Sequence, residues 1–292
     1  MWKRNIAAFF MIFMGMGSPK IPEYPLPVCD PINGISGLAE SEEKFIFFGE
    51  VHGTQEIPAF FGDVLCELLK VKKVVVALEW PKSSTDRIRN YLAAPDNENA
   101  DAEFLNYDRI WNAAIADGRN SHAMFRLMKK IKSLKKIGEN IEVAAFQPTG
   151  FNNLHHMSQD YYELVMAYNI FRIADEFPDQ TVLVLTGNFH ARLSPQTVGL
   201  KVIRPAAMRL PQEDVISFHL NNTGGTAWTC QSDGCKPHTR AEDPNSSKTN
   251  KREIIISKGI VDNYDGYYSL GTTYTSSCPA RYETCDEGLL EQ

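Results

Sequence analysis

Apolar residues in the first two thirds of the chain form two kinds of segment. Continuous apolar runs rich in β-branched or aromatic residues, typical of buried parallel strands, occur at residues 44–48, 73–78, 141–146 and 181–186. Apolar residues at helical spacing predict helices over residues 58–69, 84–92, 102–116, 121–137 and 159–177. Strands that alternate with helices predict an α/β fold, in which helices cover both faces of a mainly parallel sheet.

The pattern changes after Pro195. Short strand candidates follow one another with Gly, Asn, Ser and Pro between them, at residues 200–203, 215–220, 226–229 and 253–256. They predict an antiparallel extension of the sheet rather than a second core, and the polar residues 233–252 predict a mobile loop. We therefore expect one α/β domain over residues 44–292, with a core at 44–205 and a loop-rich extension at 206–292.

The N-terminus has the layout of a secretory signal peptide. Lys3 and Arg4 precede an apolar run at residues 6–16, and two glycines supply small side chains shortly before Ser18. A basic start, a short apolar run and small residues at a cleavage site predict a signal peptide over residues 1–17. An uncleaved N-terminal anchor is the alternative. We expect an exported protein, periplasmic or secreted, with no stable membrane span once the signal is removed.

The remainder of the composition is that of a globular protein. Of 292 residues, 43% are hydrophobic and 23% are charged, which is too apolar for a disordered chain. Residues 18–43 form a Pro-rich lead-in to the domain. With 30 Lys and Arg against 36 Asp and Glu, the net charge is -6, and no basic tract is present. Because nucleic-acid binders usually present a cationic stripe, we expect no nucleic-acid partner.

Export changes the interpretation of the six cysteines. Four of them lie in two turn-rich polar segments, where we predict local disulfides: Cys230–Cys235 and Cys278–Cys285. Cys29 lies in the lead-in and Cys66 on a predicted helix, so the sequence leaves their pairing open. A zinc site is disfavoured because no CxxC pair is present.

Polar side chains follow three of the predicted strands directly. Glu50 and His52 follow the first strand, Glu79 the second and His190 the fourth. Ligands of open α/β sheets bind outside the carboxyl ends of the strands, so we expect these four residues to converge in one catalytic pocket. Each residue alone could instead be a cap, a satisfied core histidine or a carboxylate emerging into solvent. Their repetition at successive strand ends favours a functional site, in which histidine supplies a base or a metal ligand.

Other polar residues are weaker candidates. Arg119, Asn188 and Arg192 are placed where they could bind a substrate, although a surface turn or a structural ion pair would also explain them. His155 and His156 are adjacent in a predicted loop, and we expect them to be exposed to solvent rather than to hold iron.

The strand-end motifs are similar to those of a known superfamily. FFGEVHGTQEIP, ALEWP and VLTGNFHAR, in this order over roughly residues 44–205, resemble the superfamily that unites haem-uptake ChaN proteins, erythromycin esterases and Tiki/TraB proteins. Its hallmarks are GE-x-H after the first strand, a glutamate after the second and a late G-x-x-H. The sequence YELVMAYN at 162–169 also resembles its RD-x-x-MA-x-N pattern, with Tyr162 and Glu163 in place of arginine and aspartate.

The three branches of this superfamily imply different chemistry. The esterase branch implies a histidine base, oriented by a glutamate, that activates water against an ester or lactone. The Tiki branch implies a divalent metal held by His52, Glu79 and His190, with metal-bound water attacking a peptide bond. The ChaN branch implies haem or iron binding, although Glu50 and Glu79 would repel haem propionates. We predict a hydrolase of a small-molecule or peptide substrate, with haem or iron binding as the alternative. The sequence leaves the cofactor and the oligomeric state open.

Overall fold

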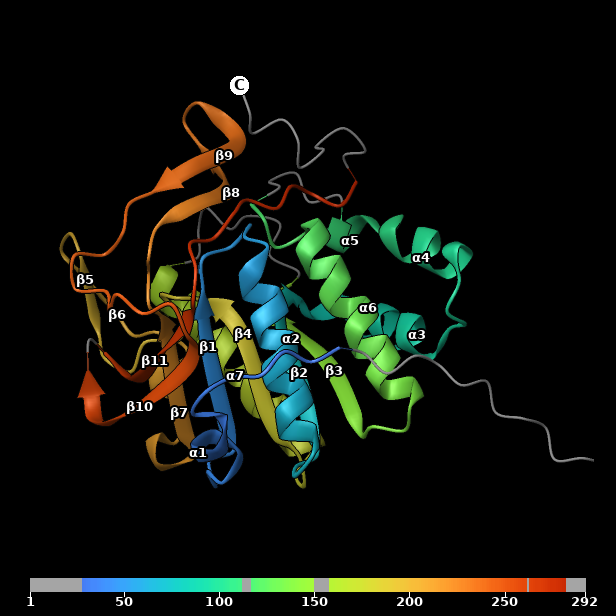
Figure 1. Ribbon diagram of the computed structural model, residues 1–292, viewed down its shortest axis with the longest axis horizontal. Helices are drawn as coiled ribbons and strands as arrows, with labels where there is room; N and C mark the ends of the chain where they lie inside the picture. Colours follow the sequence, from blue (N-terminus) through green and yellow to red (C-terminus); the bar gives the residue numbers. More distant parts are fainter. Residues whose placement is uncertain (1–27, 112–116, 150–157, 262, 282–292) are drawn as a thin grey trace, which may run out of the picture.

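The computed structural model describes residues 28–111, 117–149, 158–261 and 263–281. Seven strands form its central sheet: β1 (Phe45–Glu50), β2 (Val74–Pro81), β3 (Ile141–Gln147), β4 (Thr181–Gly187), β7 (Val215–Leu220), β10 (Arg252–Val261) and β11 (Tyr264–Leu270). Their spatial order is β10-β11-β7-β1-β4-β2-β3 (Figure 1). All neighbours in this sheet are parallel except β10 and β11.

Helices cover both faces of the sheet, which confirms the predicted fold class. On one face, Ile46 and Phe48 of β1 pack in the same core as the helices α2 (Glu56–Leu69) and α6 (His122–Lys136). On the other face, Phe45 and Phe47 pack with α7 (Gln159–Glu176). Side chains of a strand alternate between faces, so one apolar run supplies both cores. The shorter helices are α1 (Ile35–Ala39), α3 (Thr85–Ala93), α4 (Glu98–Leu105), α5 (Asp108–Trp111) and three 3-10 turns, Lys82–Ser84, Ala207–Arg209 and Gln212–Asp214.

The C-terminal third contains antiparallel pairs, as predicted, but it also extends the parallel sheet. The hairpins β5 (Gln196–Val198) with β6 (Lys201–Ile203) and β8 (Gly225–Gln231) with β9 (Gly234–Arg240) are antiparallel. The prediction that residues 215–220 are antiparallel was wrong, because β7 runs parallel to β1. A long connection carries the chain from β4 to β7, and a parallel return requires a connection of that kind. Residues 233–252, predicted to be a loop, contain β9.

The lead-in is tied to the domain. A disulfide joins Cys29 to Cys66 of α2 across 37 residues, a pairing that the sequence had left open. The predicted disulfide between Cys230 and Cys235 is confirmed and links directly opposed residues of β8 and β9.

Several predictions fall outside the described residues. They concern Cys285, the predicted partner of buried Cys278, the signal peptide at residues 1–17, and the pair His155 and His156. Within the described ranges, no helix combines the length and the apolar character needed to cross a bilayer.

The position of β4 in the sheet brings the residues of the site together. β4 lies between β1 and β2, with Glu50 of β1 in register with Gly187 and Leu78 of β2 in register with Leu185. The carboxyl ends of three parallel strands therefore lie side by side, and the polar residues that follow them meet at one edge of the sheet.

Candidate active site

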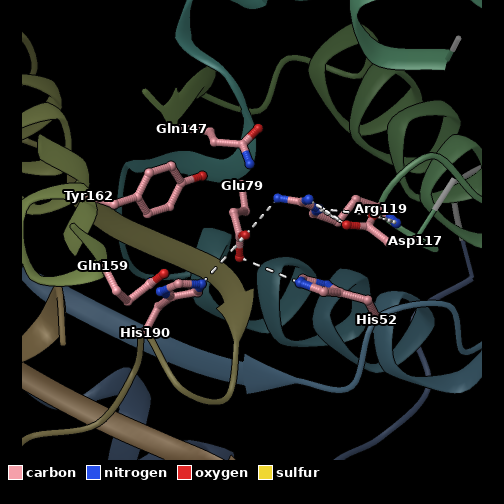
Figure 2. A pocket seen from close by; sticks show the side chains of 8 residues that line it. All are labelled: His52, Glu79, Asp117, Arg119, Gln147, Gln159, Tyr162 and His190. Carbon is pink, nitrogen blue, oxygen red and sulfur yellow. Dashed lines mark hydrogen bonds and ion pairs between the residues drawn. The ribbon is translucent and has the colours of Figure 1, made fainter. Parts of the chain in front are cut away.

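A polar pocket of about 390 Å³ lies at the carboxyl edge of the sheet (Figure 2). Eight side chains line it: His52, Glu79, Asp117, Arg119, Gln147, Gln159, Tyr162 and His190. Its volume suits a small ligand or one end of a larger one.

Glu79 lies at the centre of the pocket and is buried. Its Oε1 accepts a hydrogen bond from Nη1 of Arg119 at 2.8 Å. Its Oε2 accepts hydrogen bonds from the Thr186 hydroxyl at 2.7 Å and from the Gly187 backbone N–H at 2.9 Å. Both oxygens are thus held in place, so the carboxylate is a fixed negative charge.

His52 approaches Glu79 from one side. Its Nδ1 lies 2.8 Å from Oε1 of buried Glu50, two residues earlier in the chain. Its Nε2 lies 3.7 Å from Oε2 of Glu79. Because a carboxylate accepts hydrogen bonds, Nδ1 carries a proton, and Nε2 is the nitrogen that faces the pocket.

His190 approaches Glu79 from the opposite side (Figure 2). Its Nδ1 lies 2.8 Å from both carboxylate oxygens of Glu163, a residue of α7 that is 0% exposed. Its Nε2 lies 3.7 Å from Oε1 of Glu79. Glu163 also accepts hydrogen bonds from Nε2 of Gln159 and from the Ala206 backbone N–H. The site therefore contains two carboxylate–histidine pairs on either side of one glutamate.

Arg119 is held by a second acid. Its Nε lies 3.0 Å from Oδ1 of Asp117, and its Nη2 also bonds that carboxylate. The Trp80 indole N–H donates to the Arg119 carbonyl at 2.7 Å, which anchors the backbone of this loop to the end of β2. With Asp117 and Glu79 on its guanidinium, Arg119 organises the pocket but has little positive charge left for an anionic ligand.

The charges around Glu79 shift its pKa and those of both histidines. Burial alone would raise the pKa of Glu79, but His190, His52 and Arg119 lower it well below its usual range. Burial alone would lower the pKa of His52, yet Glu50 and Glu79 raise it overall, against the opposing charge of Arg119. Burial likewise opposes the net rise in the pKa of His190, which Glu79 and Glu163 cause.

The remaining walls carry neutral polar groups. Burial of the Tyr162 hydroxyl and the nearby charge of Glu79 raise its pKa to about 12, against the opposing charge of Arg119. This hydroxyl stays protonated near neutral pH and can donate to a ligand. Gln147 and Gln159 add amide groups on the same side of the pocket (Figure 2).

Five of the seven predicted site residues are in this cluster and two are not. The structure brings together Glu50, His52, Glu79, Arg119 and His190. Of the residues that line the pocket within the described ranges, none is Asn188 or Arg192. The side chain of Asn188 lies against Gly49, and Arg192 bonds Gln196 instead. Both follow β4 in a tight turn, in which His190 N–H donates to the Gly187 carbonyl, so neighbouring side chains diverge.

The donor set does not match a metal centre. Among the described residues, no group of three or more His, Cys, Asp or Glu side chains is arranged to hold a metal ion. The oxygens of Glu79 already accept three hydrogen bonds, one from the guanidinium of Arg119. A divalent cation between the two Nε2 atoms would displace these donors and lie close to a fixed positive charge.

Comparison with solved structures finds proteins of the same fold. The chain is similar to a mutant of erythromycin esterase EreC in its open conformation, with a TM-score of 0.58 and 10% identity, over 84% of this chain and 93% of that one. A succinoglycan biosynthesis protein gives a TM-score of 0.58 and a Bacillus cereus protein 0.59, each at 10% identity over 83% of this chain and 91% of the other. No model of a known family matches the chain, and no curated protein matches it either. At this identity the likeness shows a shared fold: an α/β architecture also used by an erythromycin esterase.

Proposed function

We propose that this protein is a hydrolase that activates water with His52 and cleaves an ester or lactone. One observation carries the proposal: two histidines present Nε2 to one pocket, and the Nδ1 of each is held by a buried carboxylate. A carboxylate that fixes an imidazole in this way makes its other nitrogen an effective base or acid. An erythromycin esterase has the same fold, which supports hydrolysis as the class of reaction.

The two histidines take different roles in this proposal. The charge of Arg119 opposes the rise in the pKa of His52 that Glu50 and Glu79 cause, and we assign the role of base to His52 on this ground. His190 sits on the fully buried Glu163 and is favoured as imidazolium, the form that can act as an acid.

The proposed reaction has two proton transfers, one at each histidine. Nε2 of His52 removes a proton from water as the oxygen attacks the carbonyl carbon of the ester. The tetrahedral oxyanion collapses and the carbon–oxygen bond to the alcohol breaks. Nε2 of His190 gives the leaving alcohol its proton, and an acid and an alcohol are released. The protonated Tyr162 hydroxyl is placed in the same pocket to donate to the oxyanion.

The charge of the pocket indicates the class of substrate. Four acids, Glu50, Glu79, Asp117 and Glu163, surround the site, and Arg119 and the imidazolium of His190 offset two of them. A carboxylate or phosphate on the substrate would be repelled, and we infer that the substrate is neutral or cationic near the scissile bond. The amides of Gln147 and Gln159 suit hydroxyl or amide groups of such a molecule.

The alternatives from the sequence fit the site less well. A metal-dependent peptidase is disfavoured, because the guanidinium of Arg119 already binds the Glu79 carboxylate that would hold the metal. Haem binding needs an apolar wall, whereas the side chains of this pocket are polar and its charge is unfavourable for propionates.

The decisive experiment compares histidine variants on a panel of neutral, cationic and anionic nitrophenyl esters. Replacing the general base in His52→Ala is expected to lower kcat/KM by about 10²–10⁴-fold, and His190→Ala by a similar factor. His122→Ala, at the start of α6 and outside the pocket, is the matched control and should retain activity. Unchanged hydrolysis in both pocket variants would overturn the proposal.

We also propose that the chain is an exported, divergent member of the superfamily whose motifs it resembles. Two disulfides support an oxidising compartment, since such bonds rarely persist in the cytosol. N-terminal sequencing of the protein recovered from a secreting host is expected to begin near Ser18. Recovery of material that still begins at Met1 would refute cleavage of the signal.

A further inference from the structure

The outer side of α7 carries an apolar stripe. Tyr161, Leu164, Tyr168 and Phe171 are 49%, 44%, 59% and 48% exposed. Their spacing of three, four and three residues places them on one side of the helix, over three turns. Solvent-facing positions of a surface helix are usually polar, and a contiguous stripe of three aromatics and a leucine marks an interaction surface.

A second apolar group lies near the N-terminal end of the stripe. In the β5–β6 hairpin, Val198, Leu200 and Val202 are at least 57% exposed. β6 packs against α7, and Arg204, directly after β6, donates from its backbone to Asp160 in the first turn of α7. The stripe and the hairpin are therefore parts of one face of the molecule.

The stripe is symmetric about its own midpoint. Tyr161 and Phe171 lie five residues on either side of Met166, and Leu164 and Tyr168 lie two residues on either side of it. A second copy of α7, rotated about a twofold axis through this point, would bring Tyr161 opposite Phe171 and Leu164 opposite Tyr168. Self-complementarity of this kind is what a closed twofold interface requires.

The charges at the two ends of α7 agree with an antiparallel pair. At the N-terminal end, Arg204 is exposed beside Asp160, and at the C-terminal end Asp175 is exposed beside Arg172. Residues 160 and 172 are equally distant from Met166. An antiparallel arrangement thus brings Asp160 of one copy to the level of Arg172 of the other, whereas a parallel arrangement brings Asp160 to the level of Asp160 and Arg172 to the level of Arg172.

The available area is sufficient. A fully exposed aromatic side chain offers about 200 Å², so the three half-exposed aromatics contribute about 300 Å². Leu164 and the three hairpin residues add a similar amount. The total is about 600 Å² per partner, the lower limit for standard interfaces, which bury about 1,200–2,000 Å² over both partners.

We propose that this protein forms a homodimer in which the α7 helices pair antiparallel through Tyr161, Leu164, Tyr168 and Phe171. This interface is independent of the proposed reaction. Glu163 is buried on the core side of α7 whereas the stripe is exposed, so the site can be complete in each copy.

Sedimentation velocity over a concentration series of the full chain tests this interface. The wild type is expected to sediment as a dimer. Leu164→Glu and Tyr168→Glu, which bury a charge at the axis, should raise the dissociation constant by about tenfold or more. Val71→Glu is the matched control, because Val71 is an exposed apolar residue (64%) elsewhere on the surface, after α2. It should leave the dimer unchanged. A monomeric wild type, or a dimer that persists in both stripe variants, would overturn the proposal.

The antiparallel arrangement has its own test. Leu164→Cys and Tyr168→Cys chains are mixed and treated with a short bismaleimide, with the wild type as the background control. Preferential linkage of one variant to the other supports the pairing of Leu164 with Tyr168. Linkage mainly within each variant indicates a parallel pair and contradicts the proposed axis.

Discussion

The two carboxylate–histidine pairs of the site have the same geometry but different origins. Both join Nδ1 of a histidine to a buried glutamate at 2.8 Å and direct Nε2 toward Glu79 at 3.7 Å. In the first pair, Glu50 and His52 are two residues apart at one strand end. In the second, Glu163 lies on α7 and His190 follows β4, 27 residues later. The first pair is local, whereas the second depends on a helix packing correctly against the sheet.

This difference extends to how firmly each glutamate is held. The carboxylate of Glu163 accepts hydrogen bonds from His190, Gln159 and the Ala206 backbone. That of Glu50 has His52 as its hydrogen-bond partner. We infer that Glu163 contributes to both the fold and the site, while Glu50 serves mainly to orient His52.

The largest effect is expected from removing the charge that both pairs share. Glu79→Gln keeps the size of the side chain but leaves Arg119 without its second acid and removes the negative charge that Nε2 of each imidazole faces. Activity is expected to fall by about 10²-fold or more, a loss comparable to removal of a general base. Steady-state kinetics on the best ester of the panel measure it. Activity within a factor of two of the wild type would show that the two pairs work independently of Glu79.

Replacing Glu50 or Glu163, the glutamates that hold the two histidines, is expected to have smaller effects, which differ in the loss of stability. Glu163→Gln places an amide N–H₂ among groups that already donate, and an unsatisfied buried polar group costs about 1–3 kcal/mol. Glu50→Gln removes one hydrogen-bond acceptor and should cost about 1 kcal/mol or less. Both should lower kcat, but urea unfolding should separate them. Equal losses of stability would mean that the two pairs are structurally equivalent.

The unfolding free energy and the activity are expected to depend on pH in different ranges. The raised pKa values of His52 and His190 contribute stability that is fully present below their ordinary value of 6.5 and is lost as pH rises through the raised values. The lowered pKa of Glu79 contributes stability that is present above its ordinary value of 4.5 and is lost as pH falls through the lowered value. The difference in unfolding free energy between wild type and Glu79→Gln should therefore be largest between about pH 4.5 and 6.5.

Activity should follow a different profile. The base must be neutral, so kcat/KM should rise with pH above about 6.5 and fall once the acid loses its proton at higher pH. In Glu79→Gln both limbs should move to lower pH, because the charge that raises both histidine pKa values is gone. An activity optimum well below pH 6.5 would contradict the assignment of a histidine base with a raised pKa.

The sequence predicts well the part of the site that lies at the strand ends. Glu50, His52, Glu79 and His190 lie at or just beyond the carboxyl ends of strands, and parallel strands bring these ends together. The same reasoning would have found Gln147, the last residue of β3. It failed for Asn188 and Arg192, because side chains in a tight turn diverge although their residues are adjacent.

The sequence gives weaker evidence for the part of the site that depends on long-range contacts, the pair of Glu163 and His190. Glu163 lies on the same side of α7 as buried Met166, Ala167 and Ile170, and an acid among such residues requires a partner. The sequence does not identify that partner, because the packing of α7 against the sheet is set by tertiary contacts. The pairing of Cys29 with Cys66 and the parallel direction of β7 depend on similar long-range contacts.

The place of β4 between β1 and β2 has a consequence for how the chain acquires its fold. Residues 45–50 and 74–81 have no direct pairing with each other, and each pairs with residues 181–187. During synthesis, more than a hundred residues must therefore emerge before the two N-terminal strands can join one sheet. Parallel pairings of such long range are slow to form. Until then β1 and β2 expose apolar edges, so this protein is expected to rely on chaperones more than its final compactness suggests.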